Sequence, residues 1–304
     1  MWYHSFNEFA KQEYGMKLYK LALDAGRTCP NRDGTCGSRG CIFCSGNGSG
    51  DFAADQRLGI TEQLAMAKKQ IQKKLPKESV GYIAYFQAFT NTYGTVEELE
   101  PLFLEAISDP SVKILSIATR PDCLPEDILT MLERLQKRIP VWIELGLQTA
   151  KEETAGYIRR GYKNDVYERA VNELKKRHIS VITHVILGLP GESMEDMLNT
   201  IDYVGHTDTQ GIKLQLLHVL KGTDLAAEYK AGAVRTMELS EYINVLELCI
   251  RHLPRSMVIH RLTGDGPKRL LIAPEWSGNK RMVMNTIIRE FYQRNVEQGS
   301  LYMQ

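Results

Sequence analysis

One cysteine-rich stretch, residues 29–44, reads Cys29-Pro-Asn-Arg-Asp-Gly-Thr-Cys36-Gly-Ser-Arg-Gly-Cys41-Ile-Phe-Cys44. A free cysteine packs as a small hydrophobe, but these thiols stand among Gly, Asn and Asp with few apolar neighbours. Packing therefore does not account for them, whereas reactivity or metal binding does. We interpret Cys29, Cys41 and Cys44 as ligands of one soft metal centre.

The stretch follows the first of six short apolar segments that are predicted as strands. The predicted strands cover residues 17–23, 80–87, 112–118, 141–147, 180–187 and 211–219, and amphipathic helices are predicted at 61–75, 96–108, 125–138, 164–178 and 194–206. Strands that alternate with helices in this way form a parallel sheet with right-handed crossovers. The pattern alone leaves two architectures open, an incomplete barrel and a doubly wound sheet.

The domain organisation follows from the same pattern. We predict a core at residues 1–220, whose cysteine loop spans 24–50, and a C-terminal extension at 221–304 that packs on the same domain. The extension is predicted to contain helices at 240–252 and 280–298 and a strand at 257–262. No Pro/Ser-rich linker, low-complexity segment or internal repeat marks a second domain.

Composition narrows the class of protein. The 304 residues are 43% hydrophobic and 25% charged, which is typical of a globular protein, and the net charge of +1 gives no global attraction to nucleic acid or to membranes. The N-terminus resembles no signal peptide, and no apolar run approaches the roughly 18 to 20 residues of a membrane span. We therefore expect a cytoplasmic protein, in which six reduced cysteines indicate metal binding or catalysis rather than disulfides.

The number of metal ligands is open at this point. Four thiolates, with Cys36 included, would make a closed site that suits structural zinc or a fully ligated cluster, whereas three would leave one metal position free. A structural zinc site usually stabilises a small fold that lacks its own core. This loop instead follows the first strand of a large array of strands and helices, and that position indicates an active site.

Polar residues near the carboxyl ends of the other strands are the next candidates, because these ends converge on the functional face of a parallel sheet. They are Gln87, Asn91, Thr92, Cys123, Glu144, Gln148, Arg160 and His184. Several have a structural alternative: a helix cap for Gln87 and Asn91, a packing residue for Cys123, a hydrogen-bonded core histidine for His184, and a solvated charged turn for Arg160. Glu144 is hardest to explain structurally, because it interrupts an apolar strand.

The combination of motifs resembles the radical S-adenosylmethionine (radical SAM) superfamily, and more narrowly its YtqA/YhcC-type proteins, which are related to the radical SAM domain of the Elongator catalytic subunit. The motifs are Cys29-Pro-Asn-Arg-Asp-Gly, Tyr85-Phe-Gln, Thr90-Asn-Thr, Thr119-Arg-Pro-Asp-Cys-Leu, Glu144-Leu-Gly-Leu-Gln, Arg160-Gly and His184-Val-Ile-Leu-Gly-Leu-Pro-Gly. Phe43 matches the aromatic residue that precedes the third cysteine in that superfamily. Cys36 has no counterpart in its three-cysteine pattern, so the resemblance makes Cys36 a non-ligand.

The resemblance implies an incomplete parallel (β/α)6 TIM-like barrel of the α/β class with a C-terminal α/β extension. It also implies a [4Fe-4S] cluster on Cys29, Cys41 and Cys44, whose fourth iron binds SAM and whose electron cleaves SAM to methionine and a 5′-deoxyadenosyl radical. Phe43, Gln148 and His184 fall within the implied cofactor site. Gln87, Asn91 and Thr92 would meet the methionine part of SAM, Glu144 its ribose hydroxyls and Arg160 its carboxylate. Cys123 is a candidate catalytic residue.

The partners are implied by the same resemblance. A flavodoxin or ferredoxin would supply low-potential electrons, and tRNA would be the substrate, modified at C5 of the wobble uridine by an aminomethyl-type reaction. Basic residues that could line the tRNA site are Arg27, Arg32, Arg39, Arg261, Lys268 and Arg269. Two alternatives stay open: a radical SAM enzyme that acts on a small molecule or peptide, and a non-catalytic, zinc-stabilised nucleic-acid-binding protein. The number of chains in the assembly is not predicted.

Overall fold

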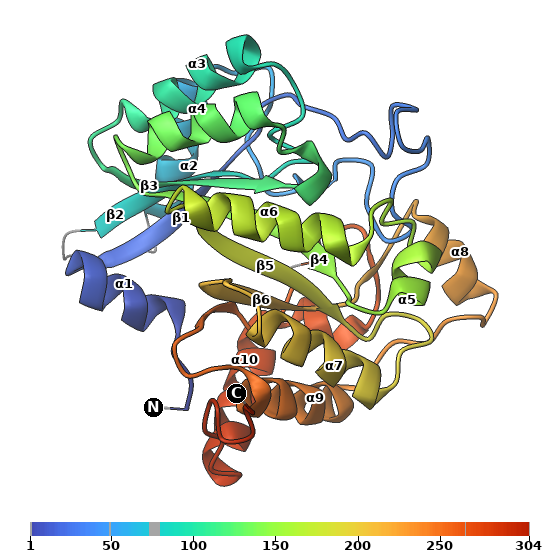
Figure 1. The fold of residues 1–304 in the computed structure, drawn as a ribbon. Helices are drawn as coiled ribbons and strands as arrows, with labels where there is room; N and C mark the ends of the chain where they lie inside the picture. Colours follow the sequence, from blue (N-terminus) through green and yellow to red (C-terminus); the bar gives the residue numbers. More distant parts are fainter. Residues whose placement is uncertain (1, 49, 73–79, 265, 304) are drawn as a thin grey trace.

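A curled parallel sheet forms the body of the molecule in the computed structural model, which describes residues 2–48, 50–72, 80–264 and 266–303. Its strands lie side by side in the order β1-β2-β3-β4-β5-β6-β8, and every neighbouring pair is parallel (Figure 1). Their bounds are β1 Lys17–Leu23, β2 Val80–Phe86, β3 Val112–Thr119, β4 Val141–Gln148, β5 Ser180–Leu187, β6 Gly211–Leu216 and β8 Val258–Arg261. The predicted incomplete α/β barrel is confirmed.

The helices that follow β1 to β5 along the chain cover the outer face of this sheet (Figure 1). Those that connect successive strands are α2 Ile60–Ile71, α3 Val96–Ile107, α4 Glu126–Gln136, α6 Asn164–Lys176 and α7 Met194–Gly205. The others are α1 Phe6–Tyr14, the short α5 Glu152–Tyr157, and α8 Asp224–Lys230, α9 Leu239–His252 and α10 Lys280–Gln293 of the C-terminal extension, together with the 3-10 turns η2 Pro121–Cys123 and η3 Glu275–Gly278. Part of the predicted helix at 61–75 lies outside the described residues.

The last core strand and the extension differ from the prediction in three places. Its strand β8 joins the main sheet beside β6, so the half-barrel has a seventh strand in addition to the six predicted. The predicted strand at 211–219 divides into β6 and the short β7 Val219–Leu220, which pairs antiparallel with β9 Leu271–Ala273. The predicted helix at 280–298 ends at Gln293, because Asn295 takes a left-handed backbone conformation with φ 48°.

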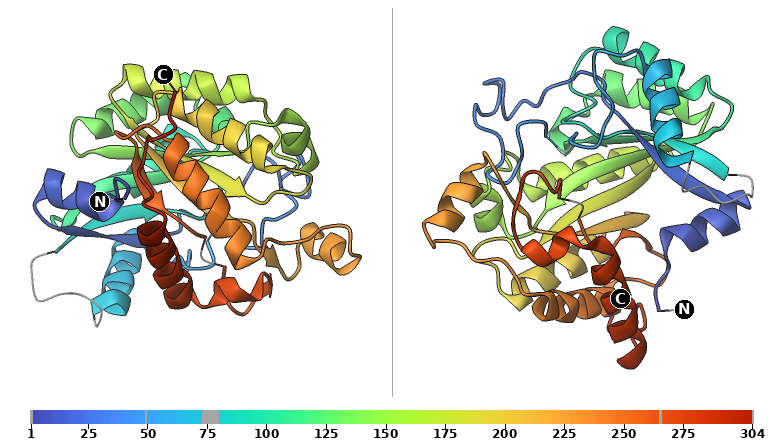
Figure 2. Two further views of the ribbon diagram at one scale, coloured as in Figure 1. Left: turned by 90° about the horizontal axis from the view of Figure 1, so that it is seen from below. Right: turned by 180° about the vertical axis from the view of Figure 1, so that it is seen from behind.

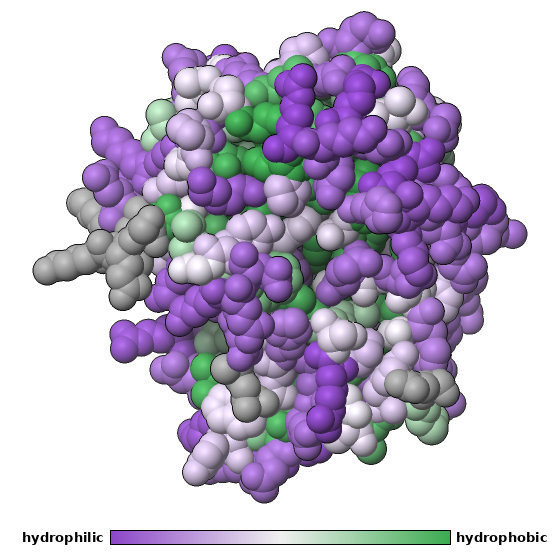
Figure 3. Space-filling view, turned by 60° about the vertical axis from the view of Figure 1, so that its left-hand side comes forward, coloured by the Kyte–Doolittle hydropathy of each residue, from purple (hydrophilic) through white to green (hydrophobic). Residues whose placement is uncertain are grey.

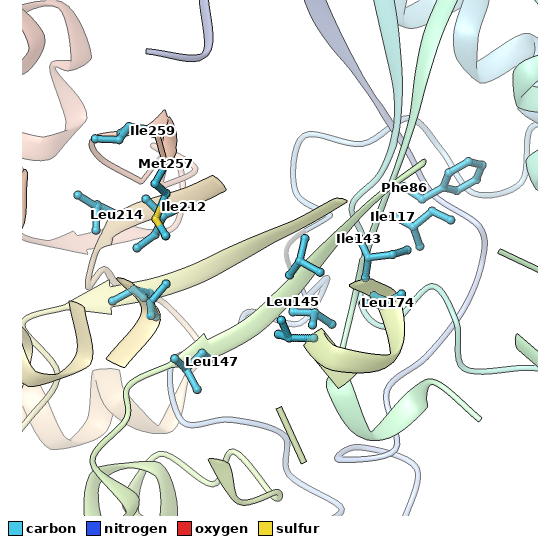
Figure 4. Close-up of a cluster of buried hydrophobic side chains, with 14 of the residues drawn as sticks. Phe86, Ile117, Ile143, Leu145, Leu147, Leu174, Ile212, Leu214, Met257 and Ile259 are labelled. Atoms are coloured by element: carbon cyan, nitrogen blue, oxygen red, sulfur yellow. The ribbon is translucent and has the colours of Figure 1, made fainter. Parts of the chain in front are cut away.

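Alternation along the strands separates an apolar outer face from an inner face that carries both apolar side chains, such as Ile114 and Ile182, and polar ones. In β4, Ile143, Leu145 and Leu147 are fully buried in the main hydrophobic core together with Leu174 of α6 (Figure 4). Because successive strand side chains point to opposite faces, Glu144 and the other intervening residues face the inside of the barrel. Each large apolar side chain buried in this way stabilises the fold by about 1.5–3 kcal/mol.

Helix α1 closes the end of the barrel at which the strands begin. Phe6 stacks on His260 with ring centroids 5.2 Å apart and meets the edge of Trp142 at 6.0 Å. Trp142 is the second residue of β4, so this aromatic group lies at the amino ends of the strands. Figure 1 shows α1 at the left and the loop that follows β1 at the right, beside α5 and α8. The carboxyl ends of the strands are therefore left for the functional site.

The C-terminal extension lies against the same sheet. Seen from behind, its orange-to-red segment lies beside the lower strands (Figure 2, right), and α9 packs on α7. The face in Figure 3 is mostly hydrophilic, with apolar residues gathered in its upper part. In the described part of the chain, no helix combines the length and apolar character needed to cross a membrane. The domain boundary at residue 220 stays a prediction.

Candidate active site

Two adjoining cavities lie at the carboxyl ends of the strands. Their volumes are about 210 and 140 Å³. Both are lined by Phe43, Cys44, Gly48, Gln148 and His184; the larger adds Tyr85, Gln87, Lys213, Gln215, His218 and Arg261, and the smaller adds Cys29, Cys41, Thr90, Arg120, Glu144, Arg160 and Tyr162. Residues predicted from the cysteine loop and from the strands β2, β4 and β5 thus meet around these two cavities.

The cysteine loop brings three of its four thiols to this space. Cys29, Cys41 and Cys44 line the smaller cavity, whereas Cys36 is exposed and is absent from the described lining of both cavities. Asn31 fixes the loop: its amide donates to the Arg159 carbonyl at 2.6 Å and contacts the Cys41 Sγ at 3.6 Å. The separation of Cys36 from the other three agrees with the predicted set of three ligands.

Further contacts hold the loop in shape. The Arg32 guanidinium donates to the carbonyls of Cys44, at 3.0 Å, and Ser45, at 2.5 Å. Gly40 has φ 71°, and a Cβ there would lie 2.9 Å from the Arg32 Nε, so both backbone conformation and space require glycine. The backbone of Ile42, between the last two cysteines of the loop, bonds to Ile158 beyond α5 and to Leu225 of α8. The extension therefore helps to position the thiols.

The chemistry of the loop fits an iron–sulfur cluster. Burial raises the pKa of the Cys41 thiol to about 12 and also raises that of Cys44, so both are protonated until a metal cation displaces the proton. Thiolates are the ligands that iron–sulfur clusters take, and hydrogen bonds to their sulfurs tune the cluster. Among the described residues, no three potential ligand side chains already surround one point at metal-binding distance. The thiols share a cavity, and Cys29, Cys41 and Cys44 would hold the cluster there.

Glu144 is the centre of a charged cluster inside the barrel. Its carboxylate accepts from Lys20 at 2.6 Å, from Ser116 at 3.0 Å, from His184 at 2.7 Å, and also from Lys213. Burial alone would raise the pKa of the Glu144 carboxyl, but Lys20 and Lys213 hold it well below its usual value. A buried carboxylate with four partners is ionised, and both of its oxygens are already engaged.

A β-bulge at Gly146 and Gln148 interrupts the end of β4. Gln148 has φ 63°, an uncommon value for a residue with a side chain, and the register with β5 shifts between the two residues. A Cβ on Gly146 would lie 2.4 Å from the Gln148 amide nitrogen, so only glycine lets this side chain turn back. The Tyr162 hydroxyl bonds to the Gly146 carbonyl at 2.5 Å. The bulge directs Gln148 into both cavities.

Asn91 and Thr92 lie beside the cavities rather than on their described walls. The Asn91 amide donates to the carbonyls of Phe86, at 3.0 Å, and Ala118, at 2.9 Å, and so ties together the ends of β2 and β3. Thr92 bonds to Thr119 at 2.5 Å, and both Asn91 and Thr92 are buried. Thr90, the preceding residue, lines the smaller cavity instead. Asn91 and Thr92 therefore hold the ends of β2 and β3 together.

Arg160 is buried, with its side chain 1% exposed, so the alternative of a solvated turn is wrong. Its guanidinium donates to the carbonyls of Leu147, Thr149 and Tyr162 at 2.8–3.0 Å.

Cys123 is buried, and it lies outside the described walls of both cavities.

Sequence reasoning missed Lys20 and Lys213, which complete the charged cluster, and it named Tyr85 only as part of a motif and not as a site residue. The Lys213 ammonium donates to the Tyr85 hydroxyl at 3.1 Å, and the ammonium groups of Lys20 and Lys213 lie 4.7 and 4.5 Å from the centre of the Tyr85 ring. The signal was present, because Lys213, like Glu144, interrupts an apolar strand. A charge that is costly to bury alone indicates a partner on another strand.

Two protein-family models match this chain. A model described as the radical SAM superfamily matches residues 27–204. The chain belongs to the radical SAM superfamily. A second model, the radical SAM C-terminal domain, matches residues 209–293. Radical SAM enzymes use a [4Fe-4S] cluster and S-adenosylmethionine, so the predicted cofactors and enzyme class are confirmed.

Relatives of this radical SAM protein support the narrower resemblance. It is 42% identical over 300 residues to the uncharacterized protein YtqA of Bacillus subtilis, with coverage of 99% of this chain and 92% of that one. It is 37% identical over 291 residues to protein YhcC of Escherichia coli, with coverage of 95% and 92%. A more distant relative is the tRNA uridine(34) acetyltransferase of Methanocaldococcus jannaschii, 25% identical over 185 residues, which span 60% of this chain and 33% of that one.

Among solved structures, the fold resembles archaeal Elp3 of Methanocaldococcus infernus with an N-terminal deletion. The TM-score is 0.68 at 16% sequence identity, and the match covers 92% of this chain and 64% of that longer chain. At this level of identity the likeness concerns the fold, and it agrees with the predicted incomplete barrel.

Proposed function

We propose that this radical SAM enzyme holds its cluster on Cys29, Cys41 and Cys44 and modifies C5 of the wobble uridine in tRNA by an aminomethyl-type reaction. The observation that supports the site most strongly is the shared cavity. Three thiols from one loop line the same cavity as Gln148 and His184, which come from strands β4 and β5. When bound, the cluster and SAM supply the radical chemistry, and the protein positions the reacting groups.

The residues divide into those that would contact SAM and those that would support them. Phe43, Gln87, Gln148 and His184 line the cavities and could contact SAM directly. Glu144 is proposed near the ribose, although its oxygens already accept four hydrogen bonds. Arg160 is proposed to act mainly by holding the end of β4, because its donors meet backbone carbonyls there.

Two observations support tRNA as the substrate class. The first is the relationship to the tRNA uridine(34) acetyltransferase, whose name states its substrate. The second is a set of basic side chains from the predicted rim: Arg261 lines the larger cavity, and exposed Arg269 bonds to Asp51 just beyond the cysteine loop at 3.0 Å. Arg39 and Lys268 are also exposed. Phosphates are bound by such groups, and single-stranded loops present splayed bases to a pocket.

An external electron donor completes the proposal. A flavodoxin or ferredoxin is the proposed partner, and a cytoplasmic location would keep the thiols reduced.

The substrate is tested by mass spectrometry of tRNA nucleosides from a deletion strain. We expect one modified wobble uridine to disappear and its precursor to accumulate. The gene with Cys36→Ala should restore the product, and the gene with Cys41→Ala should not. Binding of tRNA by the purified protein should also weaken steeply with salt, because phosphate contacts release counterions. An unchanged wobble-uridine profile would favour a small molecule or a peptide as the substrate.

A further inference from the structure

Only one of the two ring nitrogens of His184 has a hydrogen-bond partner among the described residues. His184 lies on β5, lines both cavities, and its side chain is 18% exposed. Its ring nitrogen Nε2 lies 2.7 Å from the Glu144 Oε2, and no other hydrogen bond of the His184 ring is found among the described residues. The second ring nitrogen, Nδ1, therefore has no protein partner in the described part of the chain.

The surroundings of Glu144 determine which nitrogen carries the proton. Lys20, Lys213 and Ser116 all donate to the carboxylate, so Glu144 is ionised and can only accept. The nearby Nε2 must then donate. Burial, assisted by the charge of Lys213, lowers the pKa of His184 to about 4, so the ring is neutral near pH 7. A neutral ring that is protonated at Nε2 has a lone pair at Nδ1.

We propose that His184 offers a hydrogen-bond acceptor to the group bound in the cavity, and that Glu144 is the positioning residue that fixes this tautomer. The ligand group it would recognise is a neutral N–H or O–H donor. Two sources fit: a hydroxyl or amino group of SAM, and the N3–H of a uracil base. Only if the donor is the N3–H of a uracil base does the inference rest on the proposed function.

The tautomer is tested first, without cluster or substrate. Protein labelled with ¹⁵N at its seven histidines is examined by NMR at pH 7, and the His184 ring is assigned from the signals that His184→Gln removes. We expect a protonated Nε2 and an unprotonated Nδ1. A ring protonated at Nδ1, or at both nitrogens, would overturn the proposal. A packing role alone would not require one tautomer.

Binding then identifies the source. In protein with its cluster reconstituted, SAM affinity and tRNA-dependent product formation are measured for His184→Phe and for His184→Gln, which keeps an acceptor. Loss of one buried hydrogen bond should weaken the affected ligand about tenfold in His184→Phe, with partial rescue in His184→Gln. The control is His206→Gln, because His206 is exposed on the end of α7 and contacts the Asp202 carbonyl.

The SAM and tRNA measurements distinguish the two possible sources of the hydrogen-bond donor. A tenfold loss in SAM affinity assigns the acceptor to SAM. Unchanged SAM affinity with a tenfold rise in the tRNA concentration needed for turnover assigns it to the base. No change in either measurement overturns the proposal. If wild-type protein binds SAM but does not act on tRNA, the proposed substrate fails while the NMR and SAM measurements still decide the role of His184.

Discussion

Replacing Cys29, Cys41 or Cys44 with alanine is expected to remove the iron–sulfur cluster and to reduce SAM cleavage to background. Each thiol lines the smaller cavity, and a cluster with only two cysteine ligands would lose iron. The measurement is the iron and sulfide content after anaerobic reconstitution, followed by 5′-deoxyadenosine formation with a chemical reductant.

Cys36→Ala and Cys123→Ala are the matched controls. Cys36 is exposed in the same loop, and Cys123 is buried outside the described cavity walls. Both variants should keep about the wild-type iron content. If Cys36→Ala also loses its iron, the assignment of three ligands is wrong. If Cys123→Ala keeps the cluster and cleaves SAM but forms no product, the predicted catalytic role of Cys123 gains support.

The second large effect is expected from Glu144→Gln, which should lower the free energy of unfolding by about 3–5 kcal/mol. Glu144 accepts hydrogen bonds from Lys20 and Lys213 inside the barrel. Without the carboxylate, buried Lys213 must either stay charged without its counter-ion or lose its proton, and both are unfavourable. Urea unfolding of the cluster-free protein measures the change.

Two variants sharpen this test. Glu100→Gln removes a carboxylate that pairs with Arg134 on the surface, so it should cost less than about 1 kcal/mol. The double variant Glu144→Gln/Lys213→Met removes the unpaired cation as well, so it should be less destabilised than the sum of the two single variants. A Glu144→Gln effect no larger than that of Glu100→Gln would show that the buried cluster contributes little to stability.

The fold could be predicted largely because its signals are local. Each core strand is a short apolar run between helical patterns, and β1 and β5 begin and end at the predicted residues. The seventh strand was predicted as a strand, but its place in the main sheet was not. Its partner β6 is more than 40 residues away along the chain, and periodicity carries no information about such pairing.

The site was predictable in part, for a related reason. Strand-end position brought the cysteine loop, Gln148 and His184 to one cavity as expected. It could not show whether a polar residue at a strand end faces the cavity or bonds to the backbone. Asn91 does the latter, because carbonyls at the ends of β2 and β3 lie within reach of its amide. Arg160 does both, because it lines the smaller cavity while its guanidinium donates to a carbonyl at the end of β4.

The most direct test of the central claim is the electron paramagnetic resonance spectrum of the reduced, anaerobically reconstituted protein, recorded before and after addition of SAM. Three cysteine ligands leave one iron free, so the account predicts a [4Fe-4S] signal that changes when SAM binds that iron. A colourless protein that contains one zinc and no iron would contradict the account, and so would a cluster signal that SAM leaves unchanged.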